Sequence, residues 1–429
     1  MTGVSLEARL LPAALALVSL GSCAGIFQRP MPERAERHVA RASGREILVG
    51  AAEADITPAT PQYLAGFSLA RKSTGTADSL KARAIVFVIG DLRVAVVGID
   101  NLGVMRGDAD WIKSGIEGFA AGNVFLCASH THSAPDLVGI WGFYFLSTGR
   151  DRSYVSQLRA SIARAVASAL RAAAPARLVL GKALLPPSGL VRNSNRPFVF
   201  DRRITVVRAE ALDDGRPLGT LLHLACHPEV LGRTNTLISS DFVGALCEEW
   251  RSRGLGQAVF VNGALGAMVT PDIRDRDAMG AQTMGRALAD LAETALGAGR
   301  AFGANEIEVR RRDVYVPLRS AGLSLGRLTS VLGRDLYGGC ARSSVGFLRI
   351  GEFEAVAVPG EMEPVLAERL RRRLGLPGLV VFGLCDDEIG YLMRETDARD
   401  PLFAYERSMS PCARAGELVA GALVGEAPR

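Results

Sequence analysis

The fold is decided by the stretch AIVFVI at residues 84–89, followed by GDL at 90–92 and VAVVGI at 94–99. Both apolar runs are rich in β-branched residues, and the Gly90-Asp91 pair between them is typical of a tight turn. The stretch therefore predicts two strands that pair as a hairpin.

Outward from this hairpin, predicted strands and helices alternate along the chain. Short apolar runs predict strands, and apolar residues at helical spacing predict helices. The expected strands lie at residues 124–128, 204–207, 220–222, 258–261, 354–358 and 379–382. The expected helices lie at residues 154–173, at 278–296 and after the Pro359-Gly360 turn. This pattern predicts an α/β fold of mixed, layered sheet and helix, forming a single catalytic domain over residues 47–429.

Length and composition describe a chain that can bury a sizeable core. The 429 residues are 48% hydrophobic and 22% charged, which excludes wholesale disorder. The net charge of +5 is small for this length, and arginine is scattered along the chain. Because no basic stripe with interleaved aromatic residues is present, we expect no nucleic-acid partner.

The N-terminus predicts an exported protein. Arg9 precedes an apolar run at residues 10–20, which is too short to span a bilayer comfortably but suits a secretory signal. The run leads into Leu20-Gly21-Ser22-Cys23, which resembles a bacterial lipoprotein signal over residues 1–23. In that reading a lipidated Cys23 anchors a periplasmic or outer-membrane lipoprotein; the alternative is an ordinary signal peptide cleaved near Ala24.

Residues 24–46 are polar and rich in arginine, and they predict a flexible tether between the lipid anchor and the domain. Six cysteines follow Cys23. An oxidising compartment permits disulfides, but their pairing and the oligomeric state cannot be predicted from the sequence.

Four of the five histidines fall into two short segments, and imidazole is the commonest protein ligand of zinc. His130 and His132 are two residues apart after a predicted strand, so in an extended chain both rings share a face. The pair fits a metal site or a hydrogen-bonded polar loop, and both interpretations stay open. His227 ends the second segment, whereas His223 lies deeper in an apolar run and is predicted to be a satisfied core or outer-sphere histidine.

Two later residues are weaker candidates. Glu361 follows Val358-Pro359-Gly360 and is expected to open a helix, where a carboxylate is favourable without any catalytic role. An acid after a strand and a Pro-Gly turn is also an active-site arrangement. Tyr391 follows a strand and the acidic cluster Asp386-Asp387-Glu388, and a phenolate is an uncommon metal ligand.

Taken together, these segments resemble the neutral/alkaline ceramidase family, the non-lysosomal zinc amidases. The similarity runs in order over most of residues 47–410. It is carried by 49–58, 65–67, 97–100, the His-Thr-His segment at 129–135, 193–197, 225–228 with 238–241, 358–361, 383–391 and 405–406.

The resemblance implies a catalytic zinc held by four side chains and a metal-activated water that cleaves an N-acyl linkage. The implied zinc ligands are His130, His227, Glu361 and Tyr391. The implied catalytic residues are His132 as proton donor or oxyanion partner, with Arg196 and Tyr405 lining the pocket. Such a site is chemically reasonable, because zinc lowers the pKa of water towards ~7 and polarises a carbonyl.

Two departures from the family pattern affect the expected substrate. Gly263 stands where ceramide-cleaving members carry a serine, and Ala267 stands where they carry an acid. The family's larger members also have a C-terminal β-sandwich, which we expect this protein to lack because the chain ends at Arg429. Attack by a metal-activated water does not require the serine or the acid at these positions. The changes do argue against long-chain ceramide as the substrate.

The leading hypothesis is a zinc amidohydrolase acting on N-acylsphingosine or a smaller acyl amide. One alternative is a catalytically degenerate lipoprotein that binds an amphipathic ligand, supported by Gly263 and Ala267. Another is a zinc esterase, which the sequence cannot separate from an amidase.

Overall fold

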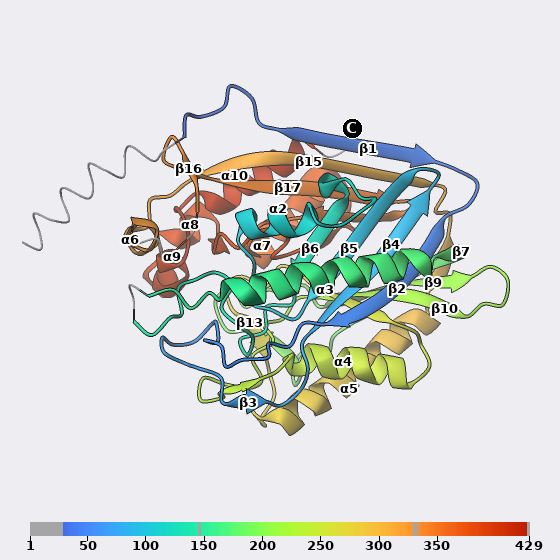
Figure 1. The fold of residues 1–429 in the computed structure, drawn as a ribbon, viewed down its shortest axis with the longest axis horizontal. Helices are drawn as coiled ribbons and strands as arrows, with labels where there is room; N and C mark the ends of the chain where they lie inside the picture. The colour runs from blue at the N-terminus through green and yellow to red at the C-terminus, as the bar shows by residue number, and fades with distance from the viewer. Residues whose placement is uncertain (1–28, 145–146, 329–331, 333, 427–429) are drawn as a thin grey trace, which may run out of the picture.

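A computed structural model of the chain describes residues 29–144, 147–328, 332 and 334–426 (Figure 1). The predicted signal segment, residues 1–23 with Cys23, and residues 24–28 of the predicted tether lie outside the described residues. Within the described ranges, none of the helices combines the length and the apolar character needed to cross a membrane.

The larger sheet has nine strands and contains the predicted hairpin. The hairpin strands pair antiparallel across a turn in which Gly90 has a φ of +56°, which confirms the prediction. The strand order is β12 (Ala258–Asn262), β10 (Pro217–Leu224), β9 (Arg203–Ala211), β7 (Ala174–Leu184), β2 (Leu48–Asp55), β4 (Lys81–Ile89), β5 (Leu92–Ile99) and β6 (Val124–Ala128), with β14 (Arg300–Phe302) beside β7.

A second sheet of six strands lies against the first. Its order is β1 (Arg37–Ser43), β15 (Glu306–Pro317), β17 (Cys340–Ile350), β18 (Phe353–Ala357) and β20 (Val380–Phe382), with β16 (Leu336–Tyr337) beside β17. Three short pairs complete the described strands: β3 (Gly75–Thr76) with β11 (Leu237–Ile238), β8 (Val191–Asn193) with β13 (Val269–Pro271), and β19 (Glu361–Met362) with β21 (Tyr391–Leu392).

Helices cover the outer faces of both sheets, so the layers run helix, sheet, sheet, helix (Figure 1). The nine-stranded sheet is covered by α2 (Arg106–Lys113), α3 (Arg152–Arg171), α4 (Asp241–Ser252) and α5 (Ala278–Gly297). The six-stranded sheet is covered by α7 (Pro364–Leu374) and α10 (Ala415–Val424). Shorter helices are α6 (Ala321–Leu328), α8 (Glu395–Ala398), α9 (Ala404–Ser408), η2 (Ala121–Asn123) and η3 (Pro401–Phe403). The predicted α/β fold of mixed, layered sheet and helix is confirmed.

The sequence of β4 is a continuous apolar run because both faces of this strand are buried. Successive side chains of a strand point to opposite faces of the sheet. Ala84 and Val86 join the core beneath the helices, whereas Ile85 and Phe87 join the core between the two sheets. Because both faces are buried, the strand reads as a continuous hydrophobic run.

The nine-stranded sheet curls so that its two ends approach each other. β12 lies at one edge, yet it contacts β5 near the other edge. At this contact a Cβ on Gly98 would lie 2.3 Å from the carbonyl oxygen of Phe260, so only glycine fits without a shift. The curl brings the end of β6 close to the ends of β10 and β12, and the two histidine segments follow β6 and β10.

Two sequence-based expectations are corrected. Residues 37–43 belong to the predicted 24–46 tether, but they form β1 and pair with β15 along the edge of the six-stranded sheet. β1 lies at an exposed edge of its sheet, so its residues are polar and rich in arginine. A polar, arginine-rich sequence is also typical of a linker, which is why the tether was predicted here. Glu361 does not open a helix: it lies in β19, and α7 begins at Pro364.

Adding a methyl group at Gly98 should destabilise the protein by about 1–3 kcal/mol, because the new Cβ overpacks against the β12 backbone. The matched control is Gly107→Ala in α2, where a Cβ would meet nothing within 4 Å. Urea unfolding of Gly98→Ala and of the control measures the difference. Equal free energies of unfolding for the two variants would contradict the close approach of β5 and β12.

Candidate metal and active site

The histidine segments begin where neighbouring buried strands end. β6 ends at Ala128, and the chain turns at His130, whose φ of +75° is in the left-handed region. β10 ends at Leu224, and His227 lies three residues further on. β10 pairs in parallel with β12, whose last residue, Asn262, lies between the two segments. Loops at the carboxyl ends of parallel strands are a common place for functional side chains.

Asn262 ties the two histidine segments together. Its fully buried carboxamide donates hydrogen bonds of 2.7 Å to the carbonyl oxygens of Ser129 and Cys226. Its Oδ1 accepts from the backbone amides of Cys226 and Gly263 at 3.1 and 2.9 Å. One side chain therefore satisfies four buried backbone groups and fixes the spacing between the segments.

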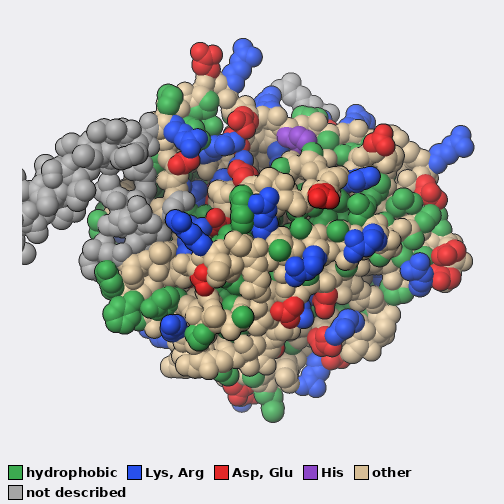
Figure 2. Space-filling model, in the orientation of Figure 1, with side chains coloured by type: hydrophobic (Ala, Val, Ile, Leu, Met, Phe, Trp, Pro, Cys, Tyr) green, Lys and Arg blue, Asp and Glu red, His purple; other side chains and the backbone are tan. Residues whose placement is uncertain are grey.

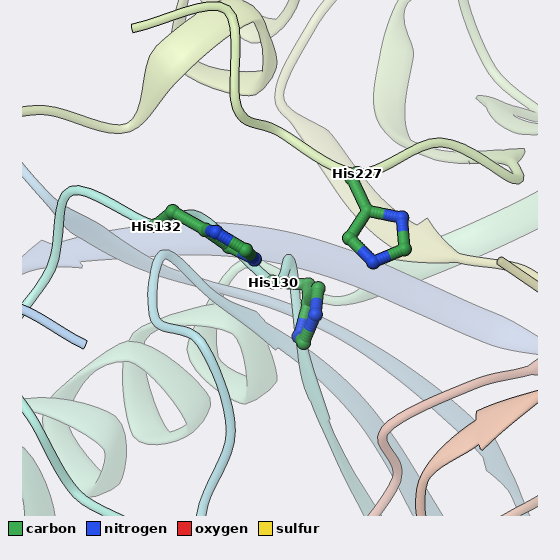
Figure 3. Close-up of side chains that lie close together, drawn as sticks. All are labelled: His130, His132 and His227. Atoms are coloured by element: carbon green, nitrogen blue, oxygen red, sulfur yellow. The ribbon is translucent and has the colours of Figure 1, made fainter. Parts of the chain in front are cut away.

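Three histidines come together in a buried group that is able to bind a metal (Figure 3). The ligand nitrogens of His130, His132 and His227 all lie within 4.8 Å of one another. His130 and His227 are 2% and 1% exposed, and the ring centroids of this pair are 4.9 Å apart. Figure 3 shows the three rings arranged around a common space.

Backbone carbonyls set the orientation of two of the rings. Nδ1 of His130 lies 2.7 Å from the carbonyl oxygen of Leu102, and Nδ1 of His227 lies 2.8 Å from that of Val269. A carbonyl oxygen only accepts hydrogen bonds, so Nδ1 must carry the proton in each ring. The Nε2 lone pairs are then free to face the centre of the group, as in metal-binding histidines.

The Glu361 carboxylate faces both Nε2 atoms. Oε2 lies 3.1 Å from Nε2 of His227, and Oε1 lies 3.7 Å from Nε2 of His130. In a tetrahedral zinc site with bonds of about 2.1 Å, neighbouring ligand atoms are about 3.4 Å apart. The spacing therefore fits a cation between these three side chains. Burial opposes ionisation of Glu361, but without a metal the positive charge of protonated His130 and His227 and a hydrogen bond from His227 outweigh burial and lower its pKa.

Tyr391 is placed next to Glu361 by backbone pairing. β19 and β21 run parallel, and Glu361 is in register with Tyr391. The Tyr391 ring is 4% exposed, and its centroid lies 6.1 Å from that of Tyr405. Burial raises the pKa of Tyr391 well above its usual value, and the charge of Glu361 adds to this effect. The phenol lies beside the carboxylate, and its hydroxyl donates a hydrogen bond to Sδ of Met268 at 3.9 Å.

His132 differs from the other two histidines because neither of its ring nitrogens has a hydrogen-bond partner among the described residues. Burial and the neighbouring His130 and His227 hold its pKa well below the usual value, so the ring is neutral. Gly66 makes room for it: a Cβ there, at a φ of +108°, would lie 2.6 Å from the His132 ring. Oε2 of Glu229 lies 3.9 Å from its Nδ1.

The site opens into a pocket whose empty space, with the open solvent at its mouth included, is about 600 Å³. Its walls are mostly apolar, and the polar side chains gather at one end. The apolar lining is Leu102, Val138, Ile140, Trp141, Leu323, Leu332, Ile389 and Met409, and the polar lining is His130, His132, Glu361, Glu388, Tyr391 and Tyr405.

The predicted site residues are thus mostly brought together. His130, His132, His227, Glu361 and Tyr391 converge, although their individual roles stay predictions. Tyr405 lies at the pocket on α9 and is 52% exposed.

Arg196 is the exception. It is exposed on the loop between β8 and β9 and lies outside the residues that line the pocket. The neighbouring Asn195 side chain donates to Glu406 at 2.5 Å, so this loop contacts α9.

Gly263 and Ala267 have structural explanations. A Cβ on Gly263 would lie 2.9 Å from Nε2 of His223, so a side chain at this position would crowd His223. Ala267 packs in an apolar cluster with Tyr391 and Met393. His223 itself is buried, and its Nε2 donates to the carbonyl oxygen of Val381 at 2.9 Å, whereas its Nδ1 has no hydrogen-bond partner among the described residues, so the predicted core histidine is satisfied at one ring nitrogen only.

Sequence reasoning missed three residues: Asn262, Gly66 and Glu388. Asn262 carried a usable signal, since a polar residue that closes an otherwise apolar strand often has a hydrogen-bonding role. Gly66 lies in a segment that resembles the family, and Glu388 lies in the acidic cluster before Tyr391, but neither signal indicates the contacts that Gly66 and Glu388 make with distant segments of the chain.

Charged side chains of both signs are interspersed over the face of the molecule that Figure 2 shows, without a large block of one sign. This distribution agrees with the scattered arginines of the sequence.

Comparisons with known proteins identify the relatives of this chain. The family model described as neutral/alkaline non-lysosomal ceramidase, N-terminal, matches residues 47–269, just over half of the chain and including all three histidines. The comparison with curated protein sequences gave no match.

Two solved structures share the fold. Neutral ceramidase from Pseudomonas aeruginosa is 19% identical with a TM-score of 0.70, over 90% of this chain and 75% of that chain. A ceramidase complexed with C2 is 18% identical with a TM-score of 0.70, over 88% of this chain and 75% of that chain.

Asn262→Asp should loosen the metal site, because an aspartate keeps the acceptor but cannot donate to the carbonyls of Ser129 and Cys226. We expect a loss of about 2–4 kcal/mol in unfolding free energy and about 10–100-fold in zinc affinity. Urea unfolding and zinc titration against a competing chelator measure the two effects. Wild-type values for both would show that Asn262 does not position the histidine segments.

His223→Gln should flatten the acid dependence of stability. Burial lowers the pKa of His223 to about 4, below the value near 6.5 in an unfolded chain. The unfolded chain therefore binds more protons between these values, so His223 costs no stability above pH ~6.5 and reduces it increasingly as pH falls to about 4. The slope of unfolding free energy should fall by up to about 1.4 kcal/mol per pH unit in this range. Identical slopes for wild type and variant would contradict the assignment.

Proposed function

Because the chain belongs to the neutral/alkaline non-lysosomal ceramidase family, we propose that it is a zinc-dependent amidohydrolase that cleaves the N-acyl linkage of ceramide or a smaller acyl amide. The observation that carries the proposal is the Glu361 carboxylate facing the Nε2 atoms of His130 and His227 at one end of an apolar pocket. Family membership supports hydrolysis of a lipid amide. The zinc ion and the identity of the acyl amide are proposed here.

The arrangement of these ligand atoms is more favourable with a zinc ion between them than without one. Two buried imidazoles direct lone pairs at a buried carboxylate, and this arrangement is repulsive unless a cation or a shared proton lies between them. Imidazole nitrogen and carboxylate oxygen are both common zinc ligands, and three or four such ligands leave room for substrate. His130, His227, Glu361 and Tyr391 would hold the ion. When bound, zinc supplies Lewis-acid polarisation of an acyl carbonyl and lowers the pKa of water.

The remaining residues supply proton transfer and substrate binding. Hydrolysis adds water to the acyl carbon and breaks the bond to nitrogen, which must gain a proton as it leaves. His132 is suited to this role because it lies beside the metal-binding side chains with both ring nitrogens unpaired. It can donate a hydrogen bond to the developing oxyanion or carry the proton to the leaving nitrogen. The apolar walls suit a fatty acyl chain, and Tyr405 lies at the rim of this pocket.

The metal test uses the purified protein and one matched control. We expect about one zinc per chain, and we expect His227→Ala to lose both the zinc and the cleavage of N-dodecanoyl-sphingosine. His38→Ala is the control, because His38 lies on β1 and its side chain is bonded to Asn123, away from the pocket. Elemental analysis and product release by chromatography are the measurements. Full turnover in chelator-treated, metal-free protein would refute the zinc proposal, and faster cleavage of the matching ester than of the amide would favour an esterase.

A further inference from the structure

One carboxyl group in the pocket has no assigned role. The Glu388 side chain lines the pocket and is 8% exposed. Its Oε1 accepts a hydrogen bond from the backbone amide of Gly390 at 2.7 Å. Its Oε2 is buried and has no hydrogen-bond partner among the described residues. An unpaired buried oxygen costs about 1–3 kcal/mol, so its presence in a substrate pocket points to a polar ligand group.

The backbone holds Glu388 close to the metal-binding side chains. A Cβ on Gly103 would lie 2.8 Å from Cβ of Glu388 and 3.4 Å from its Oε2. Gly103 follows Leu102, whose carbonyl oxygen orients His130. The absent side chain at Gly103 therefore provides the space that the carboxyl group occupies. Burial, together with the charge of the nearby Glu361, raises the pKa of Glu388.

Among the described residues, no side chain donates a hydrogen bond to this buried oxygen. The adjacent pocket walls are apolar, with Leu102, Val138 and Ile389 among them. The guanidinium of Arg334 lies close by, but its two terminal nitrogens bind the Asp387 carboxylate at 2.6 and 2.8 Å. Arg334 reaches only the backbone carbonyl of Glu388, at 3.3 Å.

We propose that Glu388 is a specificity-determining residue whose Oε2 hydrogen-bonds a hydroxyl group that the substrate carries near its amide. The inference rests on the proposed function and adds to it a residue, Glu388, that would recognise the substrate at a hydroxyl group beside the amide. A hydroxyl suits the site better than an ammonium group, because a cation beside a zinc ion is repelled. A hydroxyl also donates to a carboxylate and accepts from a carboxylic acid, so it binds in either protonation state.

Two ligands and two variants test the inference. N-dodecanoyl-sphingosine carries hydroxyl groups, and N-dodecanoyl-octadecylamine has a similar chain length without them. Glu388→Met removes both carboxyl oxygens. Glu388→Gln keeps an acceptor for the Gly390 amide and directs an NH₂ group at the substrate hydroxyl. Equilibrium binding in mixed micelles and kcat and KM are measured for each pair, with zinc content and melting temperature as folding controls.

We expect the wild type to bind the hydroxylated amide about 10–100-fold more tightly, which is the usual effect of one buried hydrogen bond to a charged or polar group. Glu388→Met should abolish most of this preference, mainly through KM, and Glu388→Gln should restore a large part of it. Equal affinity of the wild type for both ligands, or an equal loss on both in Glu388→Met, would overturn the inference and leave Glu388 a structural partner of Gly390. If the proposed hydrolysis is wrong, turnover is absent while the binding preference and its loss remain measurable.

Discussion

The carboxylate of Glu361, opposed by the lone pairs of two imidazoles, is the interaction on which the pocket depends. Each group is a hydrogen-bond acceptor, and all three are buried. Backbone carbonyls prevent His130 and His227 from turning their protonated nitrogens towards the acid. Groups that would repel one another are therefore held at ligand distance, and either a cation or a proton shared between His227 and Glu361 makes this arrangement favourable.

The fold supplies the constraint that keeps these groups in place. The nine-stranded sheet curls until β12 meets β5, and the contact is close enough to exclude a side chain at Gly98. As a result, the loops after β6 and β10 meet, although 97 positions separate His130 from His227 (227 minus 130). The Asn262 carboxamide then binds both loops through their backbone. Neither histidine depends on a flexible surface loop for its position.

Much of the fold follows from local sequence periodicity. The hairpin β4–β5, strands β6 and β12 and helices α3 and α5 were all predicted within a few residues, because an apolar period of 2 or 3.6 is visible in a short window. The long strands β7, β15 and β17 were not predicted, and neither were β1 and β19. β1 is an exposed edge strand whose identity depends on β15, and β19 is a two-residue strand that exists through its pairing with β21.

The site was predictable to a smaller extent. His130 and His227 stood out because histidine is rare in this chain, and Glu361 and Tyr391 depended on family resemblance. These side chains converge because two short strands pair with each other, and neither strand can be recognised from the composition or the residue spacing of the sequence. Asn262 also binds Ser129, and Glu388 packs against Gly103, each more than a hundred residues away in the chain, and a single sequence does not show which distant residues are in contact.

The ladder between β19 and β21 has a consequence for how this enzyme family can vary. Glu361 and Tyr391 occupy matching rungs, so the backbone hydrogen bonds around them set their separation without help from the intervening chain. Segments inserted after α7 or shortened before β20 would change the outer surface and leave this acid–phenol pair undisturbed. The relative positions of Glu361 and Tyr391 therefore do not depend on the length of the chain that connects them.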